Sequence, residues 1–155
     1  RAIGVSNFMR EHLERIELET GQLPCINQIE SHPGYWQPDL EELCVSKGIA
    51  IEAYSPLGHG GDIASAPVVH AAERLGVAPA QVVLRWHLQK GHVFIPKSTH
   101  VDRMRANLDV LGFELGVDDI AALDGLDARG NRCGNDPYTF DRPQTLEDML
   151  SRGNL

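Results

Sequence analysis

The sequence predicts an α/β fold in which parallel strands alternate with helices. Four short apolar runs of strand length alternate with stretches whose apolar residues recur at helical spacing. Each run is apolar at odd and even positions alike, which is typical of parallel strands covered on both faces. The first three runs, centred near Ile3, Ile26 and Ala50, follow one another at even intervals. Successive βα units have this organisation.

The predicted strands cover residues 2–5, 25–29, 49–54 and 92–95. The predicted helices cover residues 8–20, 38–47, 68–75, 79–90, 101–111 and 117–126. Four glycines directly follow predicted helices and are expected to end them: Gly21, Gly48, Gly76 and Gly91. One apolar face is expected on the helix at 101–111, formed by Val101, Met104, Leu108 and Leu111. The pattern weakens after residue 125, so residues 127–137 are expected to form a loop, and residues 144–155 a short helix or a frayed end.

The chain has 155 residues and a formal net charge of −8. That length allows one domain but is short for a complete (β/α)8 barrel, which takes about 250 residues. An acidic chain lacks the basic face that binding to nucleic acid requires. The sequence also contains no run of about 18 apolar residues, so it predicts no membrane-spanning helix. The three cysteines, odd in number and without C-x-x-C spacing, disfavour a disulfide framework or a zinc site and favour a cytoplasmic protein.

The chain begins with Arg1, and residues 2–5 already have the composition of a strand. Domains rarely begin inside a core strand, so we expect the sequence to be a fragment of a longer protein.

Polar side chains lie at or just beyond the carboxyl ends of all four predicted strands: Ser6 and Asn7, Gln28, Tyr54 and Ser55, and Lys97 and Ser98. The carboxyl ends of parallel strands meet at one edge of a sheet, where ligands bind in barrels and in open α/β sheets. The alternative is structural: Ser6 or Asn7 caps the next helix, and Gln28 is a hydrogen-bonded core amide.

The fourth unit has the composition of an anion site. Thr99 is expected to cap the helix that follows, whose first N–H groups favour a negative charge. Lys97 and Ser98 stand just before this helix, and Arg103 and Asn107 share one of its faces. An ammonium, a guanidinium and a hydroxyl together favour phosphate. The alternative is a solvated basic patch.

Tyr54 ends the third strand, where its ring could stack on a planar heterocycle or could pack in the core. The glycine-rich residues 55–61 follow, and such a loop lets backbone N–H groups approach a pyrophosphate. The loop lacks the G-x-G-x-x-G spacing of a Rossmann fingerprint.

Two acid–histidine pairs are weaker candidates. His59 and Asp62 lie in the same loop and could form an acid/base pair. Glu30 and His32 could form another, although His32 and Pro33 read more simply as the turn out of a strand.

Four segments together resemble the aldo-keto reductases, which are (β/α)8 barrels that use NADPH. The segments are residues 4–8, residues 27–33, residues 53–58 and residues 95–98, the last followed by Arg103 and Asn107. They occur in the family's order, and the resemblance is greatest to the bacterial branch that reduces keto-sugar acids and diketones. It implies that residues 1–140 are the C-terminal half of the barrel, with its last four βα units, and that residues 141–155 are a C-terminal tail.

The resemblance also implies contacts with NADPH or NADP+. The residues that would hold the nicotinamide carboxamide are Ser6, Asn7 and Gln28. Tyr54 would stack on the nicotinamide ring. The residues that would line the pyrophosphate are Ser55, Leu57 and Gly58. The residues that would bind the adenosine 2′-phosphate are Lys97, Ser98, Thr99 and Arg103. Asn107 would contact the adenine edge, although Ala106 stands where many members have a second adenine contact, a Glu.

The expected function is reduction of a small aldehyde or ketone to an alcohol by hydride transfer from NADPH, in the intact protein. The family's catalytic Asp, Tyr, Lys and His lie on strands that precede residue 2, so no residue of this chain is expected to be catalytic, and the fragment is expected to be inactive. It is also expected to self-associate or to need its N-terminal half. The alternative is a non-catalytic nucleotide-binding or structural module that retains the half-barrel.

Overall fold

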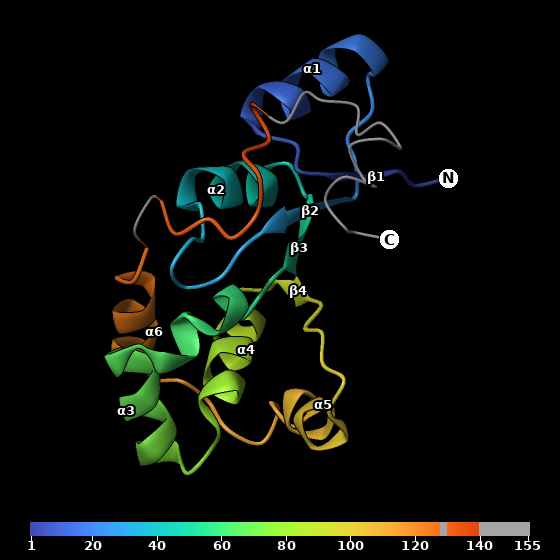
Figure 1. The fold of residues 1–155 in the computed structure, drawn as a ribbon. Coiled ribbons are helices and arrows are strands. Elements are labelled where there is room, and N and C mark those ends of the chain that lie inside the picture. The colour runs from blue at the N-terminus through green and yellow to red at the C-terminus, as the bar shows by residue number, and fades with distance from the viewer. Residues whose placement is uncertain (128–129, 140–155) are drawn as a thin grey trace, which may run out of the picture.

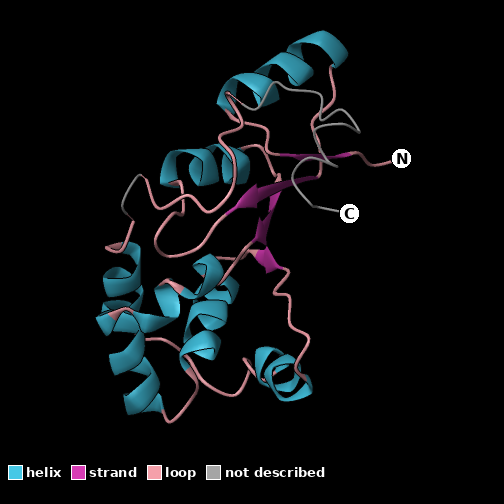
Figure 2. Ribbon diagram, in the orientation of Figure 1, coloured by secondary structure: helices cyan, strands magenta, loops and turns pink. Residues whose placement is uncertain are grey.

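The computed structural model describes residues 1–127 and 130–139, and contains one parallel sheet with helices between its strands (Figures 1 and 2). The strands are β1 (Gly4–Ser6), β2 (Ile26–Glu30), β3 (Ala50–Tyr54) and β4 (Val93–Phe94). They are hydrogen-bonded in the order β1-β2-β3-β4, and every pair is parallel. Each predicted strand is therefore confirmed within a residue or two. The predicted tail at 141–155 lies outside the described residues.

Six α-helices and two 3₁₀ turns connect and follow the strands in the described part of the chain. They are α1 (Arg10–Thr20), α2 (Pro38–Ser46), η1 (Gly58–Gly60), η2 (Asp62–Ala64), α3 (Ala66–Leu75), α4 (Pro79–Gln89), α5 (Val101–Leu108) and α6 (Val117–Asp124). Gly21 ends α1 in the left-handed region, with φ at 67°, and its N–H donates to the Glu17 carbonyl at 2.8 Å. Gly76 ends α3 in the same way, with φ at 66°. None of the described helices is long and apolar enough to cross a membrane.

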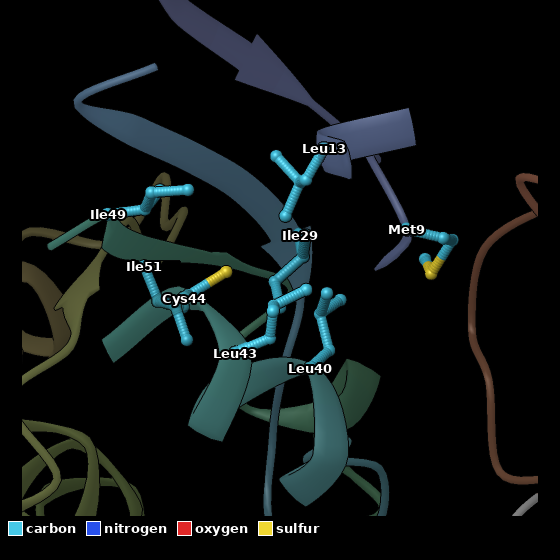
Figure 3. Close-up of a cluster of buried hydrophobic side chains, with 8 residues drawn as sticks. All are labelled: Met9, Leu13, Ile29, Leu40, Leu43, Cys44, Ile49 and Ile51. Carbon is cyan, nitrogen blue, oxygen red and sulfur yellow. The ribbon is translucent and has the colours of Figure 1, made fainter. Parts of the chain in front are cut away.

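One hydrophobic cluster lies between the sheet and the first two helices (Figure 3). Leu13 of α1 and Ile29 of β2 are fully buried, and Leu43 and Cys44 of α2 pack beside them with Ile51 of β3. These residues occupy the helical and strand positions that the periodicity predicts. Burying this stripe fixes both helices against the same face of the sheet.

A second cluster joins α3, α4 and α6. Trp86 and Val82 of α4 are fully buried, as are Val68 of α3 and Leu123 of α6. Trp86 also donates its indole N–H to Asp124 at 2.7 Å. This pairing satisfies the one polar group of a large buried ring.

Among the described residues, helices cover only one face of the sheet, so a second covering layer, which the strand pattern predicts, is not among them. We call the other face the open face, and its side chains come from Gly4, Ser6, Ile26, Gln28, Ala50, Glu52 and Val93. These residues are exposed or half-buried, whereas Ile29, Ile51 and Ala53 between them are buried. The described residues supply no layer to pack there.

Helix α5 differs from the prediction in length and in cover. It ends at Leu108, because Asp109 has a φ of −89° and a ψ of 66°, outside the helical region. The predicted apolar face is solvent-exposed: Leu108 and Leu111 are 81% and 76% exposed. In Figure 1 the helix stands apart from α1 and α2, beyond the β4 edge of the sheet. Among the described elements it packs mainly against α4.

Candidate active site

The carboxyl ends of β1 and β2 bring Ser6, Asn7 and Gln28 together. Ser6 and Gln28 are paired in the register of the two strands, and the Ser6 hydroxyl donates to the Gln28 carbonyl at 3.2 Å. The Asn7 N–H donates to the same carbonyl at 2.8 Å. Asn7 has a positive φ of 57°, a conformation that asparagine tolerates better than most residues. This turn carries the chain from the strand toward α1.

A cavity of about 720 Å³ opens beside this turn. Ser6, Asn7 and Tyr54 line one side, and residues of α1 and of the 130–139 loop line the rest, among them Asn135 and Pro137. The Asn7 Oδ1 atom is buried and has no hydrogen-bond partner among residues 1–127 and 130–139. A buried amide oxygen without a donor costs free energy, so it favours a ligand that brings an N–H group.

Gln28 lies on the open face, and its amide donates to the Glu52 carboxylate of the neighbouring strand. Gln28 does not line the cavity. Helix α1 begins with Met9 as its N-cap, so neither Ser6 nor Asn7 caps it. The capping alternative is therefore wrong for these two residues, and a hydrogen-bonded amide describes Gln28.

Tyr54 is half-buried at the end of β3, and burial raises the pKa of its hydroxyl. Ser55 follows with a positive φ of 48°, and its hydroxyl lies 3.2 Å from His59 Nε2. Leu57 packs against the second hydrophobic cluster. Gly58 has a φ of 54°, and a Cβ there would lie 2.9 Å from the Asp62 carboxylate and from His32 Nδ1. Only glycine fits this position.

The predicted phosphate residues lie at the opposite edge of the sheet, after β4 and on α5. Lys97, Thr99 and Arg103 are exposed, and Asn107 is half-buried. The N-cap of α5 is His100 and no side chain caps the helix, so the prediction that Thr99 caps it is wrong. The Ser98 hydroxyl instead accepts the His100 N–H at 3.1 Å. None of these residues lines the 720 Å³ cavity.

A buried charged cluster lies behind Gly58. The structure confirms the predicted pair of Glu30 with His32, whereas the predicted pair of His59 with Asp62 is wrong. Asp62 pairs with His32 rather than with His59: its Oδ2 lies 2.7 Å from His32 Nδ1 and also accepts the Gly34 N–H at 3.2 Å. His32 Nε2 lies 3.5 Å from Glu30 Oε1. Burial alone would lower the pKa of His32, but hydrogen bonds to Asp62 and Glu30 outweigh it and raise the pKa to about 9.

Glu30 holds the 130–139 loop against the sheet. Its carboxylate is almost fully buried and accepts the backbone N–H groups of Cys133 and Gly134, the latter at 2.9 Å. Burial would raise the pKa of Glu30, but His32 and these two N–H groups lower it to about 2. No local pattern in the sequence predicts a contact between residues so far apart.

Two further contacts hold the loop, which runs beside α2 and reaches α1 (Figure 1). Arg132 donates to the Tyr35 hydroxyl and stacks over that ring, with its guanidinium carbon 4.7 Å from the ring centre. The Tyr138 hydroxyl donates to Glu11 of α1 at 2.8 Å. The loop therefore forms a wall of the cavity that is fixed from several sides.

The sequence matches the family model described as Aldo/keto reductase family over residues 1–61 and 64–128. It is 47% identical over 140 residues to an aldo-keto reductase of Mycolicibacterium smegmatis, covering 90% of this chain and 50% of that protein. It is 42% identical to 2,5-diketo-D-gluconic acid reductase B of a Corynebacterium species, covering 91% and 51%. The chain thus spans about half the length of the curated relatives it matches.

Solved structures agree with this result. A variant of Gox0644 in complex with NADPH superposes with a TM-score of 0.88 at 45% identity, covering 91% of this chain and 52% of that one. A Bombyx mori aldo-keto reductase in complex with NADP superposes with a TM-score of 0.82 at 31% identity, covering 92% and 50%. These neighbours are β/α barrels, and the four-stranded parallel sheet matches about half of each. The chain belongs to the aldo/keto reductase family.

Proposed function

We propose that the complete protein reduces small aldehydes or ketones with NADPH, and that this chain supplies the cofactor contacts. The observation that carries the proposal is the buried Asn7 Oδ1, which no described residue hydrogen-bonds, beside a cavity lined by Ser6 and Tyr54. A carboxamide brings the N–H group that this oxygen lacks, and the Tyr54 ring offers a surface for a flat heterocycle. NADPH has both features and supplies a hydride to a carbonyl carbon.

The remaining predicted contacts fit an extended dinucleotide. A ligand whose carboxamide lies at Asn7 passes the backbone turn at Ser55 and Gly58 as it crosses the carboxyl edge of the sheet. Its other end then reaches Lys97 and Arg103, whose charges are exposed in the described part of the chain and can pair with a phosphate. The two groups of residues therefore need not meet at one point. The same assignment gives Leu57 and Gly58 to the pyrophosphate and Asn107 to the adenine.

We place the substrate among small dicarbonyl and keto-acid compounds, because one relative is named a diketo-gluconic acid reductase. In this proposal the proton for the carbonyl oxygen comes from a tyrosine outside residues 1–155. The chain alone is then expected to give no carbonyl reduction with NADPH. Turnover that disappears in Tyr35→Phe or Tyr138→Phe would instead place the acid within this chain.

The test is a fluorescence titration of the complete protein with NADPH, followed by an assay with aldehydes and diketones. Asn7→Gly removes the unpaired acceptor at a position whose positive φ glycine adopts readily, and is expected to weaken NADPH binding at least tenfold. Gln22→Gly, at an exposed amide in the loop after α1, serves as the matched control. A folded complete protein that binds no NADPH would reject the enzyme and support the non-catalytic module.

A further inference from the structure

We propose that Glu30, His32 and Cys133 form a binding site for a zinc-like divalent cation, which joins β2 to the 130–139 loop. None of these three residues is among the cofactor contacts proposed above, although His32 lies directly against Gly58. The three residues offer a carboxylate oxygen, an imidazole nitrogen and a sulfur, and these atoms all lie within 4.8 Å of one another. Zn²⁺ takes this combination of ligands.

The spacing of the three donors is close to that of a tetrahedral centre. His32 Nε2 lies 3.5 Å from Glu30 Oε1 and 3.8 Å from Cys133 Sγ. With usual zinc–ligand distances, two ligands of one tetrahedron lie about 3.4 to 3.6 Å apart. To reach this spacing, the Cys133 sulfur has to move toward the other two donor atoms by less than the van der Waals radius of sulfur. Cys133 is only half-buried and sits in a loop, so rotation about its Cα–Cβ bond can supply this movement.

The groups around the donors favour a metal ligand over a free histidine. The Asp62 carboxylate holds His32 Nδ1 at 2.7 Å, so the ring presents Nε2 to Glu30 and Cys133. A carboxylate behind the ligating imidazole is the usual outer partner at zinc sites, where it fixes the ring and its tautomer. Glu30 Oε1 accepts one N–H group from Cys133 and keeps a second lone pair for a cation.

A hollow of about 390 Å³ reaches the histidine of the cluster and is lined by His32, Asp62 and Arg132 among others, whereas Glu30 and Cys133 do not line it. Cys133 is half-buried, so solvent reaches its sulfur and water can supply a fourth ligand on that side. Binding displaces the proton of the Cys133 thiol and the proton of His32 Nε2, and both pass to solvent. The cysteine count alone disfavoured a zinc site, since it takes no account of mixed ligands from distant segments.

The test is a titration of the purified, reduced protein with Co²⁺, which replaces Zn²⁺ and gives a thiolate-to-cobalt absorption band. The band is expected in the wild type and in Cys25→Ser, an exposed thiol far from the cluster, and is expected to disappear in Cys133→Ser. Asp62→Asn should keep the band and weaken binding about 10- to 100-fold. No band in the wild type, or a band that persists in Cys133→Ser, overturns the proposal.

His32→Gln distinguishes the full site from a metal held by the thiol alone: equal affinity in this variant also overturns the proposal. Because that change can unfold the chain, a second measurement uses the wild type. Stoichiometric Zn²⁺ should slow alkylation of Cys133 by iodoacetamide at least tenfold while leaving that of Cys25 unchanged, as measured by mass spectrometry. Equal rates at Cys133 with and without Zn²⁺ overturn it independently of any variant.

Discussion

Two buried histidines of this chain have opposite preferences for a proton because their neighbours differ. His32 faces the carboxylates of Asp62 and Glu30, which raise its pKa to about 9. His87 is fully buried, and burial followed by the nearby His92 lowers its pKa to about 3. Its Nε2–H donates to the Pro56 carbonyl at 3.1 Å, which keeps the neutral ring in one tautomer. Burial lowers the pKa of both histidines, so the charged or neutral groups that face each ring decide whether its pKa ends above or below the usual value.

His87 is expected to make the protein sensitive to acid. Its pKa is lower in the folded chain than in the unfolded chain, where it is 6.5, so the unfolded state takes up the proton first. The stabilisation is complete above pH 6.5 and is lost as the pH falls toward 3, by on the order of a few kcal/mol. Urea unfolding at a series of pH values measures it.

In His87→Gln this pH dependence is expected to become shallower, since glutamine does not titrate and can still donate to Pro56. His70→Gln, at an exposed histidine of α3, should keep the wild-type slope. Equal slopes in the two variants would show that His87 is not the group responsible.

Lys97 and Arg103 are expected to decide between NADPH and NADH. In the complete protein, Lys97→Met or Arg103→Leu removes one charge-assisted contact with the 2′-phosphate, worth about 1.5–3 kcal/mol, or roughly 10- to 150-fold in affinity. Affinity for NADH, which lacks this phosphate, should change little. Fluorescence titration with both cofactors measures the difference.

Arg105→Leu is the matched control, because Arg105 is an exposed arginine of the same helix that pairs with Asp102 at 3.6 Å. It should leave the preference between the two cofactors unchanged. Equal losses of NADPH and NADH affinity in Lys97→Met and Arg103→Leu would contradict the phosphate assignment.

At the scale of elements, helix α1 is held to the sheet mainly through Leu13. This side chain is fully buried, whereas Leu18 of the same helix is 86% exposed. Leu13→Ala is expected to lower the free energy of unfolding by about 2–5 kcal/mol, because it removes buried methyl groups and leaves a cavity against Ile29. Leu18→Ala should change it by less than about 0.5 kcal/mol. Chemical denaturation of both variants gives the comparison, and similar values would mean that α1 does not dock through this face.

The elements were predictable because the signals that specify them are local. The stripe Leu40, Leu43 and Cys44 repeats at helical spacing, and Gly21 follows its helix where a left-handed residue is needed. The cover of the sheet was not predictable, since Ile26 and Ile29 are equally apolar in sequence although only Ile29 is fully buried. Which of two apolar faces is covered depends on elements elsewhere in the chain.

The candidate site was predictable only in part, for the same reason. Ser6 and Tyr54 end strands and Asn7 follows one, and parallel strands bring such residues to one edge. The pairing of His32 with Asp62 and the contact of Glu30 with Cys133 arise from folding of distant segments. A neighbour in sequence, His59, was the wrong partner for Asp62, since its side chain lies beside Ser55 instead.

At the scale of the whole molecule, the purified chain is expected to self-associate. Strands β1 and β4 have unpaired edges among the described residues, and exposed apolar side chains lie near both, including Ile3 at 40% and Ile95 at 45% exposure. Light scattering should detect dimers or larger species. Near-UV circular dichroism of Trp36 and Trp86, which pack edge to face at 6.2 Å, should report how ordered the core is. A monodisperse monomer with cooperative unfolding would contradict the half-barrel interpretation.

Three polar side chains on the open face restrict which partner this chain can pair with. Ser6, Gln28 and Glu52 lie side by side in the strand register, and Glu52 brings a carboxylate to that row. Apolar atoms placed over it would remove its water without replacing the hydrogen bonds, at a cost of several kcal/mol. If two copies of this chain paired through their open faces to close a barrel, the second copy would bring another carboxylate to the same row. A different half that carries donors at this position is therefore the better match, and a mixture of the two should favour the mixed pair over the homodimer.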